Sequence, residues 1–100
     1  QGIGNAMLEE MIYADDSNLL NDTLLDYRIP NTLDLPDKMT CIIVENSDGP
    51  GPFGAKGCGE GALAAVPAAI VNALADAGVP MNQLPLTPER VWLEIQQLEQ

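Results

Sequence analysis

Apolar residues recur at intervals of three and four positions near both ends of the chain, over residues 3–11 and 91–98. This spacing places them along one face of a helix. Thr87 followed by Pro88 is a favourable start for the second helix, because the threonine hydroxyl can cap the first turn and proline fits its first position. The pattern therefore predicts a helix at each end of the chain.

Another helical region is predicted in the alanine-rich stretch that follows Glu60. Pro67 interrupts this stretch, and a proline inside a helix costs roughly 3 kcal/mol. We therefore expect two helical pieces rather than one, of which the second runs from Pro67 to Ala77. Gly78 follows it, at a position where helices commonly end on a glycine.

Two other segments predict extended structure. Residues 11–14 and 19–20 flank a polar turn at residues 15–18, which is typical of a short hairpin. Met39 to Glu45 is apolar and rich in β-branched residues, which predicts a buried strand. Cys41 lies inside it and is expected to be a small buried residue.

The predicted fold class is α+β: an N-terminal helix, a short hairpin, a buried strand, a glycine-rich loop and C-terminal helices. Residues 22–36 show no sustained periodicity and contain two prolines, so we expect irregular chain with one helical turn. No linker, repeat or low-complexity tract divides the chain. We therefore expect residues 1–100 to form a single segment.

Charge narrows the range of partners. The chain has 100 residues, and 4 Lys and Arg against 15 Asp and Glu give a formal net charge of −11. This charge repels phosphate backbones and anionic lipid surfaces, and no stretch reaches the roughly eighteen apolar residues of a membrane span. We expect neither nucleic acid nor membrane as a partner. With no His and two Cys, the chain's own residues also provide too few ligands for a zinc site.

The most informative segment is 49–61, where six of the nine glycines surround one carboxylate, Glu60. Glycine at this density lets a backbone approach a ligand closely. Residues 49–54 match a dinucleotide-binding pattern, but prolines fill two variable positions and no helix is expected to open at Gly54. A dinucleotide site is therefore disfavoured.

A phosphate-binding loop is disfavoured as well, because Ala55 and Gly57 replace the glycine and the hydroxyl residue expected on either side of Lys56. A tight, solvent-exposed connection remains an alternative. Cys58 is either a packing residue or an exposed, reactive thiol.

Three motifs together carry a resemblance to a known family. They are Gln-Gly-Ile-Gly-Asn-Ala-Met-Leu-Glu-Glu at residues 1–10, Gly-Ala-Lys-Gly-Cys-Gly-Glu at 54–60 and Leu-Pro-Leu-Thr-Pro-Glu-Arg-Val at 84–91. The chain resembles the C-terminal end of the molybdenum-binding subunit of the xanthine dehydrogenase, aldehyde oxidoreductase and carbon monoxide dehydrogenase family. The resemblance implies the C-terminal part of a molybdopterin-binding domain within a longer polypeptide.

The resemblance also implies roles for individual residues. Glu60 corresponds to the catalytic base, and Gln1 corresponds to the glutamine that lies against the molybdenum centre. The implied reaction is hydroxylation of an aldehyde, an N-heterocycle or a similar substrate, with the oxygen derived from water. At position 58 the family more usually has a branched apolar residue. The implied cofactor-binding residues are Gln1, Gly2, Lys56, Gly57, Cys58 and Gly59.

The implied cofactor of the intact enzyme is molybdopterin with molybdenum, in the plain or the cytosine dinucleotide form. Iron–sulfur clusters and FAD would reside on other domains or subunits, and we expect the isolated chain to hold no cofactor and to be inactive. The implied partners are the remainder of the molybdenum subunit, the electron-transfer subunits and a small-molecule substrate. We expect a cytoplasmic location.

Two further expectations concern association. Residues 62–77 contain only Asp76 as a charge, so we expect a homo-oligomer when the chain is isolated. The main alternative to a catalytic role is a non-catalytic assembly or interaction module whose glycine-rich loop docks a partner chain. An anion-binding loop is less favoured because of the strongly acidic composition.

Overall fold

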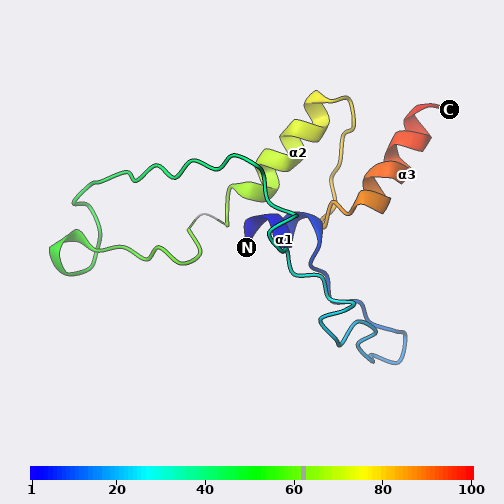
Figure 1. Ribbon diagram of the computed structural model, residues 1–100, viewed down its shortest axis with the longest axis horizontal. Coiled ribbons are helices and arrows are strands. Elements are labelled where there is room, and N and C mark those ends of the chain that lie inside the picture. The colour runs from blue at the N-terminus through cyan, green and yellow to red at the C-terminus, as the bar shows by residue number, and fades with distance from the viewer. Residues whose placement is uncertain (62) are drawn as a thin grey trace.

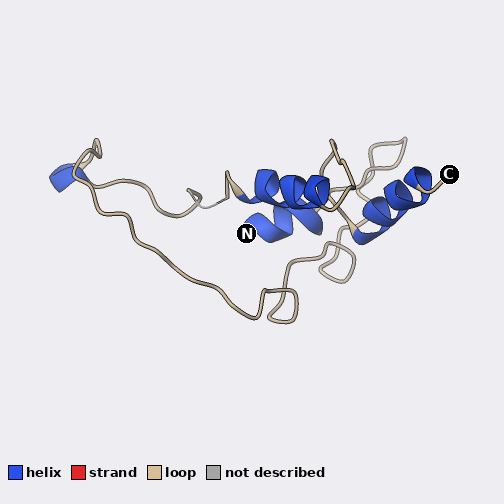
Figure 2. Ribbon diagram, turned by 90° about the horizontal axis from the view of Figure 1, so that it is seen from above, coloured by secondary structure: helices blue, strands red, loops and turns tan. Residues whose placement is uncertain are grey.

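Three α-helices and one 3-10 turn provide the regular structure in the computed structural model, which describes residues 1–61 and 63–100 (Figure 1). The helices are α1 (Gly2–Met7), α2 (Val66–Asp76) and α3 (Pro88–Leu98), and the 3-10 turn η1 spans Pro52–Gly54. Helix α1 lies at the centre with α2 packed across it, and the view from above in Figure 2 shows the same contact. No helix in the described residues is long and apolar enough to cross a membrane.

The contacts of α1 define the small core. Gly2 lies so close to α2 that an added Cβ would be 2.6 Å from Val66 Cγ2. On another side of the helix, the Leu86 backbone N–H donates a hydrogen bond of 2.6 Å to the Ala6 carbonyl oxygen. Ala6 and Leu86 are both fully buried. Since a helix of six residues is unstable on its own, these contacts hold α1 in place.

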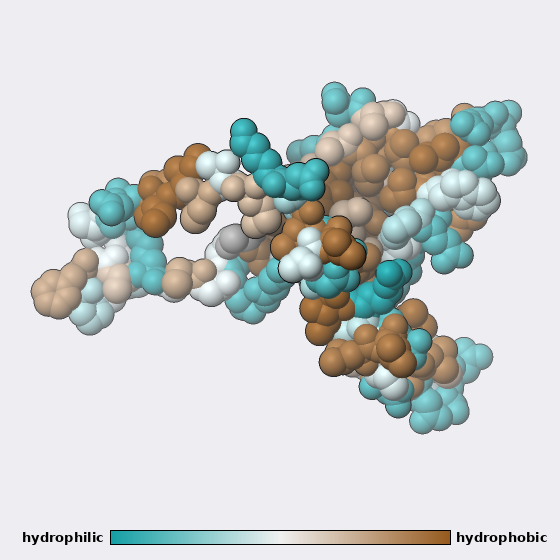
Figure 3. Space-filling model, in the orientation of Figure 1, coloured by the Kyte–Doolittle hydropathy of each residue, from teal (hydrophilic) through white to brown (hydrophobic). Residues whose placement is uncertain are grey.

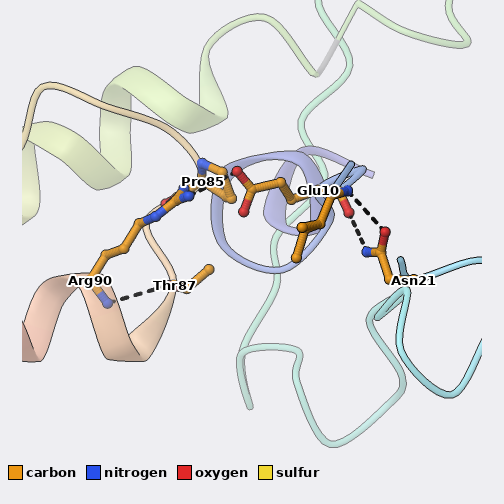
Figure 4. A network of polar contacts seen from close by, with 6 residues as sticks. Glu10, Asn21, Pro85, Thr87 and Arg90 are labelled. Atoms are coloured by element: carbon orange, nitrogen blue, oxygen red, sulfur yellow. Dashed lines mark hydrogen bonds and ion pairs between the residues drawn. The ribbon is translucent and has the colours of Figure 1, made fainter. Parts of the chain in front are cut away.

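A polar network beside α1 joins the two ends of the chain (Figure 4). Arg90 Nη2 donates to Glu10 Oε1 at 2.8 Å, and Arg90 Nη1 donates to the Pro85 carbonyl oxygen at 3.1 Å. Asn21, which is 8% exposed, donates to the Glu10 carbonyl oxygen at 2.6 Å and accepts from the Ile12 N–H at 2.9 Å. The side-chain amide thus replaces a backbone partner for both groups.

The predicted helix ends at Thr87 and Gly78 are confirmed. Thr87 Oγ1 accepts a hydrogen bond of 3.3 Å from the Arg90 backbone N–H, so it caps α3. Pro67 stands in the first turn of α2, and Gly78 follows that helix with a φ of +85°. This φ lies in the left-handed region, which glycine adopts at little cost.

The helical piece expected between Glu60 and Pro67 is not formed in the described part of that stretch. Residues 60–61 and 63–65 are turns and a bend, and helix begins only at Val66. Ala62 lies outside the described residues. The local reason is Pro67, because its ring prevents a continuous helix from extending back through the preceding turns.

A short hairpin is present at the predicted position. Its two sides are joined by an antiparallel bridge between Tyr13 and Leu19 and do not form longer strands. The Ala14 N–H donates to the Asn18 carbonyl oxygen at 2.9 Å. Ser17 in the turn has a φ of 68°, as polar turn residues tolerate. Residues 22–36 are irregular, as expected, but they contain two hydrogen-bonded turns, at residues 23–27 and 31–34, where one helical turn was predicted.

The buried strand predicted from Met39 to Glu45 is not present, and the prediction that Cys41 is buried is wrong. The whole segment is exposed, and in the described residues no strand lies beside it. A strand needs a hydrogen-bonded neighbour, and the sequence pattern does not reveal whether one is available. The α+β class is therefore not confirmed for this chain.

The molecule is extended for its length. Its radius of gyration is 17.4 Å, against about 13 Å for a compact domain of 100 residues. Apolar side chains remain exposed on several parts of the surface (Figure 3). The contacts of the described residues therefore bury only a fraction of the apolar surface of the chain.

Replacing Leu86 tests the core. Leu86→Ala should lower the free energy of unfolding by about 2–5 kcal/mol, because it removes a fully buried side chain and leaves a cavity. Leu25→Ala, at a position that is 91% exposed, should change it by less than about 0.5 kcal/mol. Urea denaturation of the chain, followed by circular dichroism, measures both. Equal effects of the two substitutions would contradict this core.

The pair formed by Tyr27 and Glu9 predicts a pH effect. The Tyr27 hydroxyl donates to Glu9 Oε2 at 2.7 Å. This hydrogen bond, with smaller contributions from desolvation and the carboxylate charge, raises the pKa of Tyr27 above its ordinary value of 10.0. Because the folded pKa exceeds the unfolded one, the stabilisation is complete below the unfolded pKa and is lost as pH rises through the folded pKa.

A tyrosinate absorbance titration of the Tyr13→Phe variant isolates Tyr27, because the chain contains two tyrosines. Adding Glu9→Gln should move the titration midpoint to lower pH, since the carboxylate acceptor is gone. An unchanged midpoint would show that the pair does not form.

Candidate active site

Segment 46–61, here called the loop, forms the tip and the returning leg of a long excursion away from the helical part of the molecule, and residues 39–45 form the outgoing leg (Figure 1). At its tip the Gly51 N–H donates to the Ala55 carbonyl oxygen at 3.1 Å. Gly54 has a φ of +78°, and an added Cβ there would be 2.8 Å from the Ser47 carbonyl oxygen. Glycine at position 54 is thus required by the turn itself.

The glycines nearer to Glu60 have a different explanation. A Cβ added at Gly57 or Gly59 would meet nothing within 4 Å, and neither residue has a positive φ. The packing of the described chain therefore does not require glycine at either position. Their backbone is open to approach by another molecule, which suits a large ligand that packs flat against main chain.

The side chains of Gln1 and Glu60 meet although they lie 59 positions apart. Gln1 Nε2 donates to Glu60 Oε1 at 3.2 Å, and both residues are exposed. Gln1 is the N-cap residue of α1, but its side chain makes no capping hydrogen bond, so the amide is available for this contact. This hydrogen bond therefore joins the motif at residues 1–10 to the motif at residues 54–60. It does so at Gln1 and Glu60, for which the resemblance implies contact with the molybdenum centre and the role of catalytic base.

A cleft of about 350 Å³ opens beside this contact. Helix α1, the start of α2, the irregular segment before the loop and the end of the loop all contribute to it. Its lining combines the amide of Gln1 and the backbone of two glycines with apolar side chains. The lining residues are Gln1, Gly2, Ile3, Leu35, Met39, Gly59, Leu63 and Val66.

The cleft includes apolar residues that the sequence analysis did not identify. Leu35 lies in the segment predicted to be irregular, Met39 begins the segment predicted to be a buried strand, and no periodicity links either of them to residues 1–3. Leu63 and Val66 are three positions apart, which is the only local signal that they share a face. Their common site depends on the path of the chain.

The side chain of Glu60 reaches Gln1 at the edge of the cleft, but Glu60 and the remaining predicted site residues are not among those that line it. Lys56 Nζ donates to Asn46 Oδ1, which links the two legs of the loop near its tip. Gly57 and Cys58 are exposed. The cysteine is therefore not a packing residue in this chain, and its thiol is free. Among residues 1–61 and 63–100, no group of three or more His, Cys, Asp or Glu is placed to hold a metal ion.

The chain is similar to known proteins over most of its length. Residues 1–36 match the model of a molybdopterin cofactor-binding domain. The chain is 39% identical, over 98% of its length, to the 6-hydroxypseudooxynicotine dehydrogenase complex subunit gamma of Paenarthrobacter nicotinovorans. It is 43% identical, over 93% of its length, to a putative xanthine dehydrogenase molybdenum-binding subunit of Escherichia coli.

A solved structure shows the same likeness. The chain matches quinoline 2-oxidoreductase from Pseudomonas putida 86 with a TM-score of 0.72 and 43% identity, over 97% of this chain. The chain spans 13% of the length of that structure and 12–13% of the two relatives above. The resemblance is therefore confirmed: this chain belongs to the family of the molybdenum-binding subunits of xanthine dehydrogenase, aldehyde oxidoreductase and carbon monoxide dehydrogenase.

Two glycine substitutions should separate packing from ligand approach. Gly2→Ala should lower the free energy of unfolding by about 1–3 kcal/mol, because its Cβ would overlap Val66. Gly59→Ala should change it by less than about 1 kcal/mol, because its Cβ points into open space. Urea denaturation of both variants measures this. A Gly59→Ala loss as large as that of Gly2→Ala would mean that the chain itself needs this glycine.

Proposed function

We propose that this chain is the C-terminal portion of a molybdenum hydroxylase subunit, in which it supplies the catalytic base and part of the pterin-cofactor pocket. The observation that carries the proposal is the hydrogen bond between Gln1 and Glu60. It brings together the proposed cofactor-contacting amide and the proposed base, at the edge of a cleft that Gly59 also lines.

The residues present fit a molybdopterin cofactor. Gly57 and Gly59 leave their backbone open, and the Gln1 amide and the Lys56 ammonium group are exposed donors. Such donors suit the polar edges and the phosphate of a pterin. When bound, the cofactor would supply the redox chemistry of oxygen insertion, and either its plain or its cytosine dinucleotide form is compatible with this proposal.

Glu60 is proposed to accept a proton from the water-derived oxygen. Oε1 already accepts the Gln1 amide hydrogen, and within the described residues Oε2 has no hydrogen-bond donor. This geometry supports different roles for the two oxygen atoms of Glu60. Oε1 would orient the carboxylate through its hydrogen bond with Gln1, and Oε2 would accept the proton. A base held in this way typically contributes ~10²–10⁴-fold to the rate.

The proposed substrate class is an aldehyde, an N-heterocycle or a similar small molecule. The cleft walls formed by Leu35, Met39 and Leu63 are apolar, which favours a flat and poorly charged ring over a polar metabolite. Relatives are named for nicotine and quinoline. Iron–sulfur and flavin subunits are the proposed partners, in keeping with relatives described as a complex subunit and a large chain.

A non-catalytic assembly module is the second candidate, and the exposed apolar side chains favour it. Such a module would need the surface of the chain but not the carboxylate of Glu60. The two candidates therefore differ in a single functional group.

Glu60→Gln in the full-length subunit should abolish turnover while the protein stays folded and loaded with cofactor. Glutamine keeps the size and the contact with Gln1, but it cannot accept the proton at neutral pH. The loss should be at least ~10²-fold in kcat. Steady-state turnover and molybdenum analysis of the purified enzyme measure the two quantities.

Glu45→Gln is the matched control, since it removes the same charge from an exposed position before the loop. It should leave turnover within about twofold, as expected for a surface substitution. If Glu60→Gln kept more than about a tenth of the activity at saturating substrate, the assignment of the base would be wrong.

A further inference from the structure

Residues 39–44, here called the apolar segment, are exposed along their whole length. Met39 is 70% exposed, and Ile42 and Val44 are 80% and 82% exposed. The segment carries no charge and leads directly into the loop that bears Glu60. It forms most of the outgoing leg, which runs from the helical part of the molecule toward the tip of the loop, and Figure 3 shows apolar side chains along this leg.

The backbone of the apolar segment is unpaired. It forms no helix, turn or bridge, and among the described residues no hydrogen bond joins its amides or carbonyls to another part of the chain. Among the described residues the returning leg of the loop does not pair with it, since hydrogen bonds link the chain across the loop only nearer the tip, between Gly51 and Ala55 and between Asn46 and Lys56. Both backbone edges are thus free.

The side-chain pattern indicates what this backbone requires. In an extended conformation Met39, Cys41 and Ile43 fall on one face, and Thr40, Ile42 and Val44 fall on the other. Both faces are therefore apolar or β-branched. This is the pattern of a strand that is covered on both sides, rather than of an edge strand with one face in water.

We propose that the apolar segment docks as a strand onto a sheet edge in the remainder of the longer subunit. This inference rests on the proposed function in one respect, namely that the chain is a segment of that subunit. Main-chain hydrogen bonds would provide the affinity, and pockets for alternate side chains would provide the register. Relatives are about eight times as long as this chain, which spans 13% of one of them, so most of such a subunit is available as the partner.

The other occupants fit less well. A second copy of the chain carries the same formal net charge of −11, so the two copies would repel each other. An anionic lipid surface would be repelled for the same reason.

Docking would also position the base. Met39 lines the cleft beside Gln1 and Gly59, and seven residues later the chain enters the loop. Fixing the outgoing leg limits the motion of the whole loop, including the returning leg that carries Glu60. The apolar segment is thus a positioning element for the proposed active site.

Hydrogen exchange measured by mass spectrometry tests the docking. In the isolated 100-residue chain the amides of residues 40–45 should exchange at close to unprotected rates. In the full-length subunit they should exchange at least ~100-fold more slowly. Equally fast exchange in the full-length subunit would overturn the proposal. Protection that appears in the isolated chain as its concentration rises would instead identify a second copy as the partner, which also overturns it.

Two variants of the full-length subunit sharpen the test. Ile42→Asp should reduce the protection of residues 40–45 at least ~10-fold, and Phe53→Asp, at an exposed apolar position at the loop tip, should leave it unchanged. If Ile42→Asp does not fold, the wild-type comparison still decides. Glu60→Gln should retain full protection while losing turnover. An active wild-type enzyme without protection refutes docking alone, and a protected Glu60→Gln variant that is active refutes the base alone.

Discussion

The contact between Ala6 and Leu86 is the constraint on which the rest of the structure depends. These residues are fully buried and are joined by a backbone hydrogen bond of 2.6 Å. The contact anchors α1, which is too short to be stable alone, against the segment that precedes α3. Once α1 is fixed, its N-terminus presents Gln1 to the end of the glycine-rich loop, and Glu10 reaches Arg90.

The attraction between the charges of Arg90 and Glu10 contributes little to the stability of the fold. The pair matters more because each residue is also hydrogen-bonded to another part of the chain. Both side chains are 33% exposed, so solvent screens their attraction, and such pairs contribute little to stability. Arg90 also donates to the Pro85 carbonyl oxygen, and Asn21 satisfies the backbone on the other side of Glu10. The network therefore specifies how the two ends of the chain meet, whereas burial of Leu86 provides the larger stabilisation.

The glycine-rich loop combines two uses of glycine. At position 54 the turn requires a left-handed φ and close contact with the Ser47 backbone. At positions 57 and 59 the chain imposes no such requirement, and the absence of side chains keeps the backbone beside Glu60 accessible. Turn geometry explains the glycine at position 54, and access for a ligand is the proposed explanation of the glycines at positions 57 and 59.

The sequence by itself determined the features that depend on local chemistry. The cap at Thr87, the stop at Gly78 and the turn around Ser17 follow from the preferences of single residues and their immediate neighbours. Likewise, the family resemblance was carried by short motifs that contain Gln1 and Glu60. The predictions of the cap, the helix end and the turn were correct because residues close in sequence meet whatever the rest of the chain does.

Only the tertiary structure decided the features that depend on distant partners. Gln1 contacts Glu60, and Asn21 forms hydrogen bonds with the backbone of Glu10 and Ile12. Together with the apolar walls of the cleft, these contacts join residues whose spacing in sequence carries no periodic signal. The strand at residues 39–45 was predicted from composition, but a strand forms only when another strand offers its hydrogen bonds. The described residues offer none, so the same side chains that suit a buried strand lie exposed to solvent.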